Sequence, residues 1–389
     1  MAITLDGLLR TATEAGASDL HVKAGSYPMM RVHGTLVPAS EERRLEREDT
    51  AAMVDSILSP SQQEKFKEKL DLDLAHSVPG LGRFRCNVFQ QRGTLGLVMR
   101  IISTKVHTID ELGLPPVLKK VAEEERGLVL VTGTTGSGKS TTLAAMIDHI
   151  NNTRSAHIMT VEDPIEYLHR DHRSIVNQRE VTVDTMGFAP ALRAALRQDP
   201  DVILVGEMRD HETIETALSA AETGHLVFST LHTLDATETI NRIIAVFPPH
   251  QQRQVRLQLA SVLKAAVSQR LIPKTDGHGR AAAVEVMLAT PFIRDCIVDK
   301  EKTSLIPGAI ASGTSQYGMQ TFDQSIYGLY ERGDVTLDEA LRWATNVDEF
   351  KLKIAGISTT AETAREEMSR VANAPPASKT SPTIERFGS

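Results

Sequence analysis

The sequence predicts an α/β protein with two parts: a small α+β domain, then a larger domain built around a mainly parallel sheet. Segments with helical or period-two spacing of apolar residues fill the first 102 residues. After the LPP segment at 114–116 the pattern changes, and four short apolar runs alternate with helical segments. That alternation is typical of parallel strands joined by helices.

Residues 1–102 form the first predicted domain. The elements expected here are a helix carrying Leu5, Leu8, Leu9 and Ala12 on one side, strands at 19–22 and 28–36 with a hairpin tip at His33 and Gly34, a helical stretch at 40–58, and strands at 82–89 and 96–102. Residues 103–116 are expected to be a linker, because two consecutive prolines end it and interrupt regular structure.

Residues 117–355 form the second predicted domain. Its apolar runs, expected to be buried parallel strands, are at 127–131, 157–161, 201–205 and 226–230. The remaining residues, 356–389, include a stretch rich in Pro, Ser, Thr and Ala, and this composition predicts a disordered tail.

Composition restricts the class of protein. The net charge of −7 argues against a broad nucleic-acid-binding surface, which is usually basic. The chain has two cysteines, too few for a four-cysteine zinc site, and cysteines this sparse suit a reducing compartment. Neither a signal peptide nor an apolar run of membrane-spanning length is present. We therefore expect a cytoplasmic protein without direct membrane insertion, which reaches a membrane only through a partner.

A complete phosphate-binding loop follows the first apolar run. The pattern GxxxxGK[ST] matches by chance on the order of once in a hundred chains of this length. Its glycines let backbone N–H groups surround an anion at a helix N-terminus, the lysine reaches the β and γ phosphates, and the hydroxyl ligates Mg²⁺. We therefore predict an ATP and Mg²⁺ site, with Ser140 as the metal ligand, formed by Gly133, Thr134, Thr135, Gly136, Ser137, Gly138, Lys139, Ser140 and Thr141.

Acidic residues follow two of the other apolar runs. Glu162 and Asp163 come after the run at 157–161, and Glu207 comes after the run at 201–205. Ligand sites of α/β proteins lie at the carboxyl ends of strands, where a carboxylate can orient the water that attacks ATP. Glu207 is the predicted catalytic acid, although Gly206 stands where a metal-holding Asp is usual. For Asp163 the alternative is structural, with Asp163 as the N-cap and Pro164 as the first residue of a helix.

Two further groups of residues have a candidate role beside a γ-phosphate. His232 ends the run that begins at 226, so it is placed either to contact the phosphate or to serve a structural role. Arg83, Arg85 and Arg100 lie on predicted strands of the first domain. They are either solvated or salt-bridged residues or, in an oligomer, a source of an arginine that acts on a neighbour's ATP.

Five motifs together resemble the secretion-type ATPases, and among these the PilT family of type IV pilus retraction ATPases. They are GTTGSGKST (133–141), TVEDPIEYLH (160–169), VNQREV (176–181), LRQDPDVILVGEMRD (196–210) and AETGHLVFSTLHT (221–233). The resemblance implies a PAS-like N-terminal domain joined to a RecA-like P-loop ATPase domain, in a homohexamer that engages an inner-membrane pilus platform protein. It also implies Glu207 as general base, Glu162 as a supporting acid, and His232 near the γ-phosphate.

The resemblance favours retraction over pilus assembly or type II secretion, because assembly ATPases usually carry a longer N-terminal region and a four-cysteine zinc site. Residues 291–301 match the retraction family's AIRNLIRE-like segment only in part. An accessory retraction paralogue therefore stays open beside the main motor. An assembly or secretion motor on the same scaffold, and a regulatory nucleotide-binding subunit without turnover, stay open as well.

Overall fold

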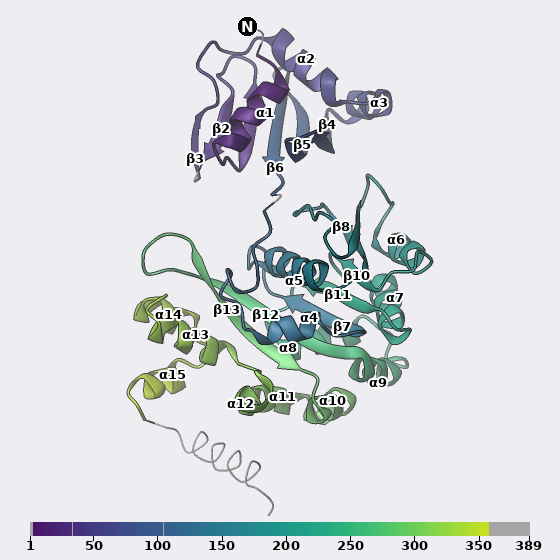
Figure 1. Ribbon diagram of the computed structural model, residues 1–389, viewed down its shortest axis with the longest axis vertical. Coiled ribbons are helices and arrows are strands. Elements are labelled where there is room, and N and C mark those ends of the chain that lie inside the picture. The colour runs from purple at the N-terminus through teal and green to yellow at the C-terminus, as the bar shows by residue number, and fades with distance from the viewer. Residues whose placement is uncertain (1–2, 33, 104, 358–389) are drawn as a thin grey trace, which may run out of the picture.

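The computed structural model describes residues 3–32, 34–103 and 105–357, whose strands form two sheets (Figure 1). In spatial order, the first sheet contains β3 (Thr35–Pro38), β2 (Met29–Val32), β1 (Asp19–Lys23), β6 (Thr94–Ile101), β5 (Gly82–Gln91) and β4 (Asp71–Val78). All of its pairings are antiparallel. Helices α1 (Leu5–Glu14), α2 (Arg47–Ile57) and α3 (Pro60–Lys69) accompany this sheet.

The first sheet and its helices share one hydrophobic core. Leu5, Leu8, Leu9 and Ala12 of α1 are all buried there, as the helical spacing predicted. The predicted hairpin is present, since Val32 pairs with Thr35, and Gly34 has a φ of +83°; His33 lies outside the described residues. The helical stretch predicted at 40–58 is too long, because α2 begins only at Arg47. The side chains of Glu46, the N-cap, and Asp49, in the first turn, form a capping box at this start.

The second sheet is mainly parallel. In spatial order its strands are β13 (Arg280–Leu288), β12 (Leu263–Pro273), β7 (Gly127–Thr132), β11 (Leu226–Leu231), β10 (Val202–Val205), β8 (His157–Glu162) and β9 (Ile175–Glu180). Only the pairing of β12 with β13 is antiparallel. The four predicted apolar runs are its central strands, whereas β9, β12 and β13, like β4 of the first sheet, were not predicted.

Helices cover both faces of the second sheet, which explains why its central strands are mostly apolar and buried along nearly their whole length. Leu128 and Leu130 of β7 pack with helices on one face, while Val129 and Val131 pack on the other. The first face packs against α6 (Phe188–Ala195), α7 (His211–Glu222), α8 (Ala236–Ala245), α9 (Gln252–Val262), α10 (Pro291–Val298) and α11 (Ile306–Ser312). The second packs against α4 (Val117–Ala122) and α5 (Lys139–Thr153).

Short elements follow β13. The 3₁₀ helix η1 (Lys300–Leu305) contacts α10 and α11, and α12 (Thr314–Tyr317) contacts α11. Beside β12 and β13 lie α13 (Phe322–Glu331), α14 (Leu337–Trp343) and α15 (Val347–Ile354) (Figure 1). Of the tail predicted to be disordered, residues 358–389 lie outside the described part of the chain.

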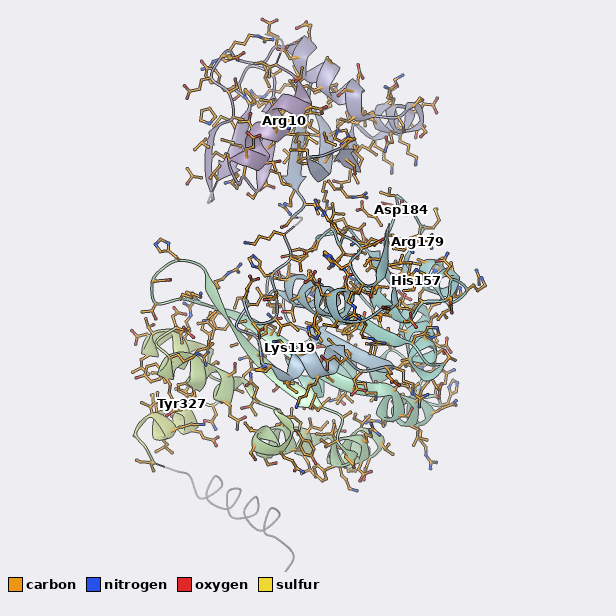
Figure 2. All side chains as sticks on the ribbon, viewed as in Figure 1. Arg10, Lys119, His157, Arg179, Asp184 and Tyr327 are labelled. Carbon is orange, nitrogen blue, oxygen red and sulfur yellow. The ribbon has the colours of Figure 1, made fainter. Side chains whose placement is uncertain are left out.

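Contacts between described residues connect the first sheet and the segment after it with the second domain. Arg83 of β5 donates a hydrogen bond to Glu180 of β9, and Ser103, just after β6, forms a bridge with Tyr167. In the segment predicted as a linker, Ile109 and Leu114 are buried against α4 and α5. Beside Glu180, Arg179 donates to the carbonyl of Asp184, so the chain turns back at the end of β9 (Figure 2).

Within the described part of the chain, no helix has the length and apolar composition needed to cross a bilayer.

Candidate active site

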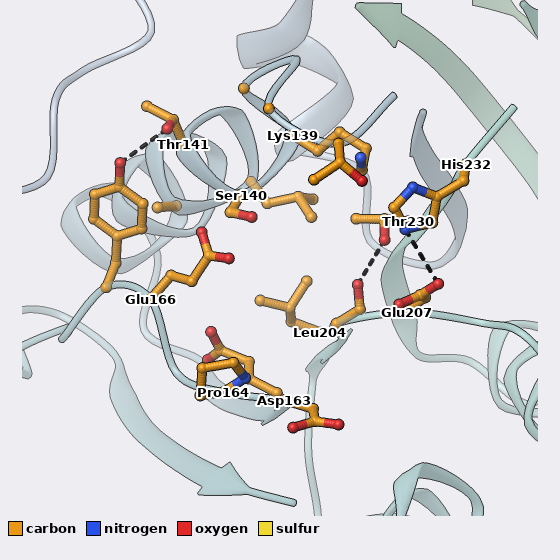
Figure 3. A pocket seen from close by; sticks show the side chains of 18 of the residues that line it. Lys139, Ser140, Thr141, Asp163, Pro164, Glu166, Leu204, Glu207, Thr230 and His232 are labelled. Atoms are coloured by element: carbon orange, nitrogen blue, oxygen red, sulfur yellow. Dashed lines mark hydrogen bonds and ion pairs between the residues drawn. The ribbon is translucent and has the colours of Figure 1, made fainter. Parts of the chain in front are cut away.

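A cavity of about 400 Å³ lies at the carboxyl ends of the parallel strands (Figure 3). Its lining brings together the phosphate loop after β7, the acids after β8 and β10, and the histidine after β11. Adjacent strands in register produce this arrangement, because Val205 of β10 pairs with both Val161 and Ser229. The sequence-based placement of these residues at one edge of the sheet therefore agrees with the structure.

The phosphate loop connects β7 to α5 through a backbone that requires glycine. Gly133, Gly136 and Gly138 have φ values of 140°, 79° and 93°. A Cβ atom on Gly133 would lie 2.5 Å from the carbonyl oxygen of Gln269 on β12, so no larger residue fits. Gln269 also accepts a hydrogen bond from Thr142 at 2.9 Å, which fixes α5 against β12.

Lys139 lies inside the loop. Its Nζ atom donates to the carbonyl oxygens of Gly133 and Thr134, at 2.9 and 3.0 Å, and the residue is only 9% exposed. Burial lowers the pKa of Lys139, and the carboxylates of Glu207 and Glu166 oppose this effect. The Lys139 ammonium group is thus fixed inside the loop, near two carboxylates that favour its charged form.

Glu162 ends β8 in a recess of the cavity. Its Oε1 atom accepts hydrogen bonds from Thr160 at 2.6 Å and from Gln178 of β9 at 3.1 Å. Burial raises the pKa of Glu162, and these two hydrogen bonds oppose the shift. The neighbouring Asp163 is exposed and lines the cavity, and no helix follows it. The alternative assignment of Asp163 and Pro164 as the start of a helix is therefore wrong.

Glu207 and His232 contact each other across the ends of β10 and β11. The Nε2 atom of His232 lies 3.2 Å from Oε1 of Glu207. Arg209 also contacts this carboxylate, from the exposed side. The loop that carries Glu207 is tied to β11, since Thr230 donates to the carbonyl of Gly206 at 2.7 Å (Figure 3).

The three candidate arginines differ in their surroundings, and the cavity lining includes none of them. Arg83 pairs with Glu180 at 3.1 Å, and Arg100 pairs with Asp19 at 3.1 Å. Arg85 lies directly across from Arg100 on the neighbouring strand and is exposed. Among the described residues, its side chain has no ion-pair partner.

Several residues of the site were not predicted from the sequence. Tyr167 forms a 2.8 Å hydrogen bond with Thr141 in the first turn of α5, Gln178 holds Glu162, and Arg280 of β13 lines the cavity beside the phosphate loop. Tyr167 and Gln178 belong to the motifs at 160–169 and 176–181, so the motifs themselves could have indicated them. Arg280 begins a strand that the sequence analysis did not predict, so nothing in the sequence indicated it.

These residues fit a nucleoside triphosphate and Mg²⁺. Backbone amides and Lys139 provide donors for phosphate oxygens at the N-terminus of α5. The Ser137 hydroxyl is buried in the loop, with no hydrogen-bond partner among the described residues. Ser140 in the first turn of α5, and Glu162 and Asp163 at the end of β8, add hydroxyl and carboxylate oxygens to the lining, and oxygen atoms are what Mg²⁺ prefers.

Known proteins share this architecture. A profile of the family described as Type II/IV secretion system protein matches residues 1–311. The chain is 49% identical to the Type IV pilus retractation ATPase PilT of Pseudomonas aeruginosa, over 88% of this chain and 98% of that protein. It is 44% identical to the Type IV pilus ATPase PilU of the same organism, over 89% of this chain and 90% of that protein.

A solved structure agrees with these sequence relationships. The crystal structure of the pilus retraction motor PilT with bound ADP superposes with a TM-score of 0.81 and 46% identity, covering 89% of this chain and 98% of that one. The predicted fold, an N-terminal domain followed by a RecA-like ATPase domain, is confirmed. Because the profile and these relatives cover most of the chain, this protein belongs to the Type II/IV secretion system protein family, the secretion-type ATPases that its motifs predicted.

Proposed function

We propose that this protein is an ATP-hydrolysing motor that powers type IV pilus retraction. The observation that supports it best is the meeting of a complete phosphate loop with Glu162, Glu207 and His232 in one cavity. These are the parts that a P-loop ATPase requires for turnover. The mechanical output is inferred from relatives, of which one is named a pilus retractation ATPase and another, from Neisseria gonorrhoeae, a twitching motility protein.

Binding of ATP places its phosphates in the loop between β7 and α5. The loop amides and Lys139 neutralise the β and γ phosphates, because their donors converge at the N-terminus of a helix. The Ser140 hydroxyl would hold Mg²⁺, which supplies charge neutralisation between these phosphates. Glu162 and Asp163, which line the same cavity, would hold water beside that metal.

Hydrolysis proceeds by attack of a water molecule in line with the bond that breaks. The water oxygen bonds to the γ-phosphorus, the bond to the β–γ bridging oxygen breaks, and Glu207 receives the proton of the water. His232, in contact with Glu207, donates a hydrogen bond to the γ-phosphate as it leaves.

The working unit is a homohexamer. Arg83, Arg85 and Arg100 do not line the cavity of their own subunit, so one of them acts on ATP from a neighbouring subunit. Arg85 is the best candidate, since Arg83 and Arg100 are already paired with Glu180 and Asp19. Closure of residues 1–102 over the nucleotide, about the segment 103–116, provides the mechanical step.

The motor works in the cytoplasm and reaches the inner membrane through the pilus platform protein. The phenotype of cells that lack the gene distinguishes a retraction motor from the other motors with this fold. Cells that lack it should carry abundant pili that do not retract. Cells without pili would instead indicate an assembly or secretion motor, and normal retraction that fails only under load would indicate an accessory paralogue.

A further inference from the structure

Glu285 of β13 is a buried carboxyl group outside the catalytic set described above. The residue is only 8% exposed, and its Oε1 atom accepts a hydrogen bond from the backbone N–H of Ala236 at 2.9 Å. Ala236 is the first residue of α8, and its amide is among those that a helix leaves without an internal partner. Such an amide is usually satisfied by water or an adjacent side chain, so a buried carboxylate here calls for a further role.

The segment that Glu285 holds is the one that carries His232. Four residues, 232–235, connect the end of β11 to α8. Hydrogen bonds with α8 shape this segment: the hydroxyls of Thr233 and Thr239 lie 2.6 Å apart, and the Leu234 amide donates to Glu238 at 2.8 Å. Asp235 likewise bonds to Glu238 and Thr239. These partners belong to α8 itself, so the bonds shape the segment without fixing it against the sheet. Glu285 supplies that attachment.

On its other side, Glu285 is connected to the phosphate loop. Its cross-strand neighbour on β12 is Ser268, and the neighbour of Ser268 on β7 is Thr132. The Thr132 hydroxyl donates to the Ser268 hydroxyl at 3.1 Å, and Thr132 immediately precedes Gly133. Thr132, Ser268 and Glu285 therefore form a row of polar residues across three neighbouring strands, from the base of the phosphate loop to the start of α8.

Charged groups surround Glu285 on two sides. Asp235 faces it from the N-cap of α8, and Arg270 faces it from β12, where the guanidinium lies over the ring of Phe322. A cavity of about 250 Å³, lined by residues of α11, α13 and α15, reaches Glu285 from the C-terminal helices. The carboxyl group thus bonds to the start of α8, has Arg270 and Asp235 as charged neighbours, and lines a cavity next to the C-terminal helices.

We propose that Glu285 is a positioning residue that holds segment 232–235 in register with the phosphate loop, so that His232 stays against Glu207. The inference rests on the hydrolytic role proposed above for His232. It adds a group that touches neither ATP nor the reacting atoms, yet determines whether His232 lies within 3.2 Å of Glu207. A displacement of about 1 Å at such a position can lower a rate about 100-fold.

Two substitutions separate the position of the acceptor atom from the presence of a carboxyl group. Glu285→Gln keeps an oxygen in reach of the Ala236 amide, whereas Glu285→Asp keeps the carboxyl group but withdraws the acceptor by one methylene. We expect Glu285→Asp to lower kcat for ATP hydrolysis about tenfold with KM changed less than about threefold, and Glu285→Gln to stay within about twofold of the unchanged protein. Val284→Ala is the control. It creates a cavity on the opposite face of the same strand, so it shows what a loss of stability alone does to kcat.

The same substitutions are then made in a His232→Ala background. If Glu285 acts through His232, Glu285→Asp causes no further loss of kcat there. Equal losses in Glu285→Asp and Glu285→Gln, or an undiminished effect of Glu285→Asp without His232, would overturn the inference. If the single substitution His232→Ala left kcat unchanged, that result would overturn the proposed role of His232, and the inference about Glu285 with it.

Discussion

The Nε2 atom of His232 lies 3.2 Å from the Oε1 atom of Glu207, across the ends of two neighbouring parallel strands. Glu207 and His232 are 25 positions apart in the sequence, and the pairing of Val205 with Ser229 brings them together. The contact joins the proposed general base with the residue proposed to touch the γ-phosphate, so we expect substitution of either one to slow hydrolysis.

Substitution of Glu207 by Gln should lower kcat for ATP hydrolysis by about 100-fold or more, because an amide cannot accept the proton of the attacking water. The KM for ATP should stay within about threefold, since the phosphate loop is unchanged. Steady-state phosphate release from the purified protein measures both. Glu215→Gln, on the exposed side of α7, is the matched control. Full activity of Glu207→Gln would remove Glu207 as the base.

An arginine that acts on a neighbour's ATP predicts complementation between two inactive variants. Arg85→Ala lacks the arginine that it would supply to its neighbour, and Lys139→Ala lacks a working phosphate loop. In a randomly mixed ring, on the order of one quarter of the sites combine an intact loop with an intact arginine. Mixing the two variants before assembly should therefore restore on the order of a quarter of the ATPase activity. A mixture no more active than either variant alone would show that Arg85 does not act in trans.

Glu285 predicts a dependence of stability on pH. Burial raises its pKa from 4.5 to about 7, with a further contribution from Asp235. Because the folded protein holds this proton more tightly than the unfolded chain, the stabilisation is complete below pH 4.5 and is lost as the pH rises through 7. From pH 5 to pH 8 this group should lower the free energy of unfolding by about 2–3 kcal/mol.

Glu285→Gln removes that titration, so the variant should gain stability relative to the unchanged protein as the pH rises. Denaturation followed by the fluorescence of Trp343, the single tryptophan of the chain, measures the difference. Trp343 is a suitable reporter, because its carbonyl accepts a hydrogen bond from Arg270 beside Glu285. A stability difference that is constant from pH 5 to pH 8 would contradict the prediction.

Local patterns in the sequence were sufficient for the phosphate loop and for the acids and histidine around it. The glycines at 133, 136 and 138 encode the loop backbone directly. Glu162, Glu207 and His232 could be placed without knowing the strand order, because parallel strands have their carboxyl ends at the same edge of a sheet.

The supporting residues could not be predicted, because their roles depend on which strands become neighbours. Gln269 and Ser268 reach the phosphate loop only because β12 lies beside β7, so that Thr132 meets a residue 136 positions away. The pairing of Arg83 with Glu180 spans 97 positions and likewise has no local signature. Glu285 was missed for the same reason, since its partners are Ala236 of α8 and Ser268 of β12, and the apolar residues around it in β13 fit a buried helix as well as a strand.

Live imaging of fluorescently labelled pili, in cells whose own copy of the gene carries Lys139→Ala, tests the central claim most directly. Lys119→Ala, a surface lysine paired with Asp110, is the control (Figure 2). The proposed function predicts that Lys139→Ala cells extend pili that then stay extended, whereas the control cells retract theirs. Pili that retract at the normal frequency and speed in Lys139→Ala cells would contradict it.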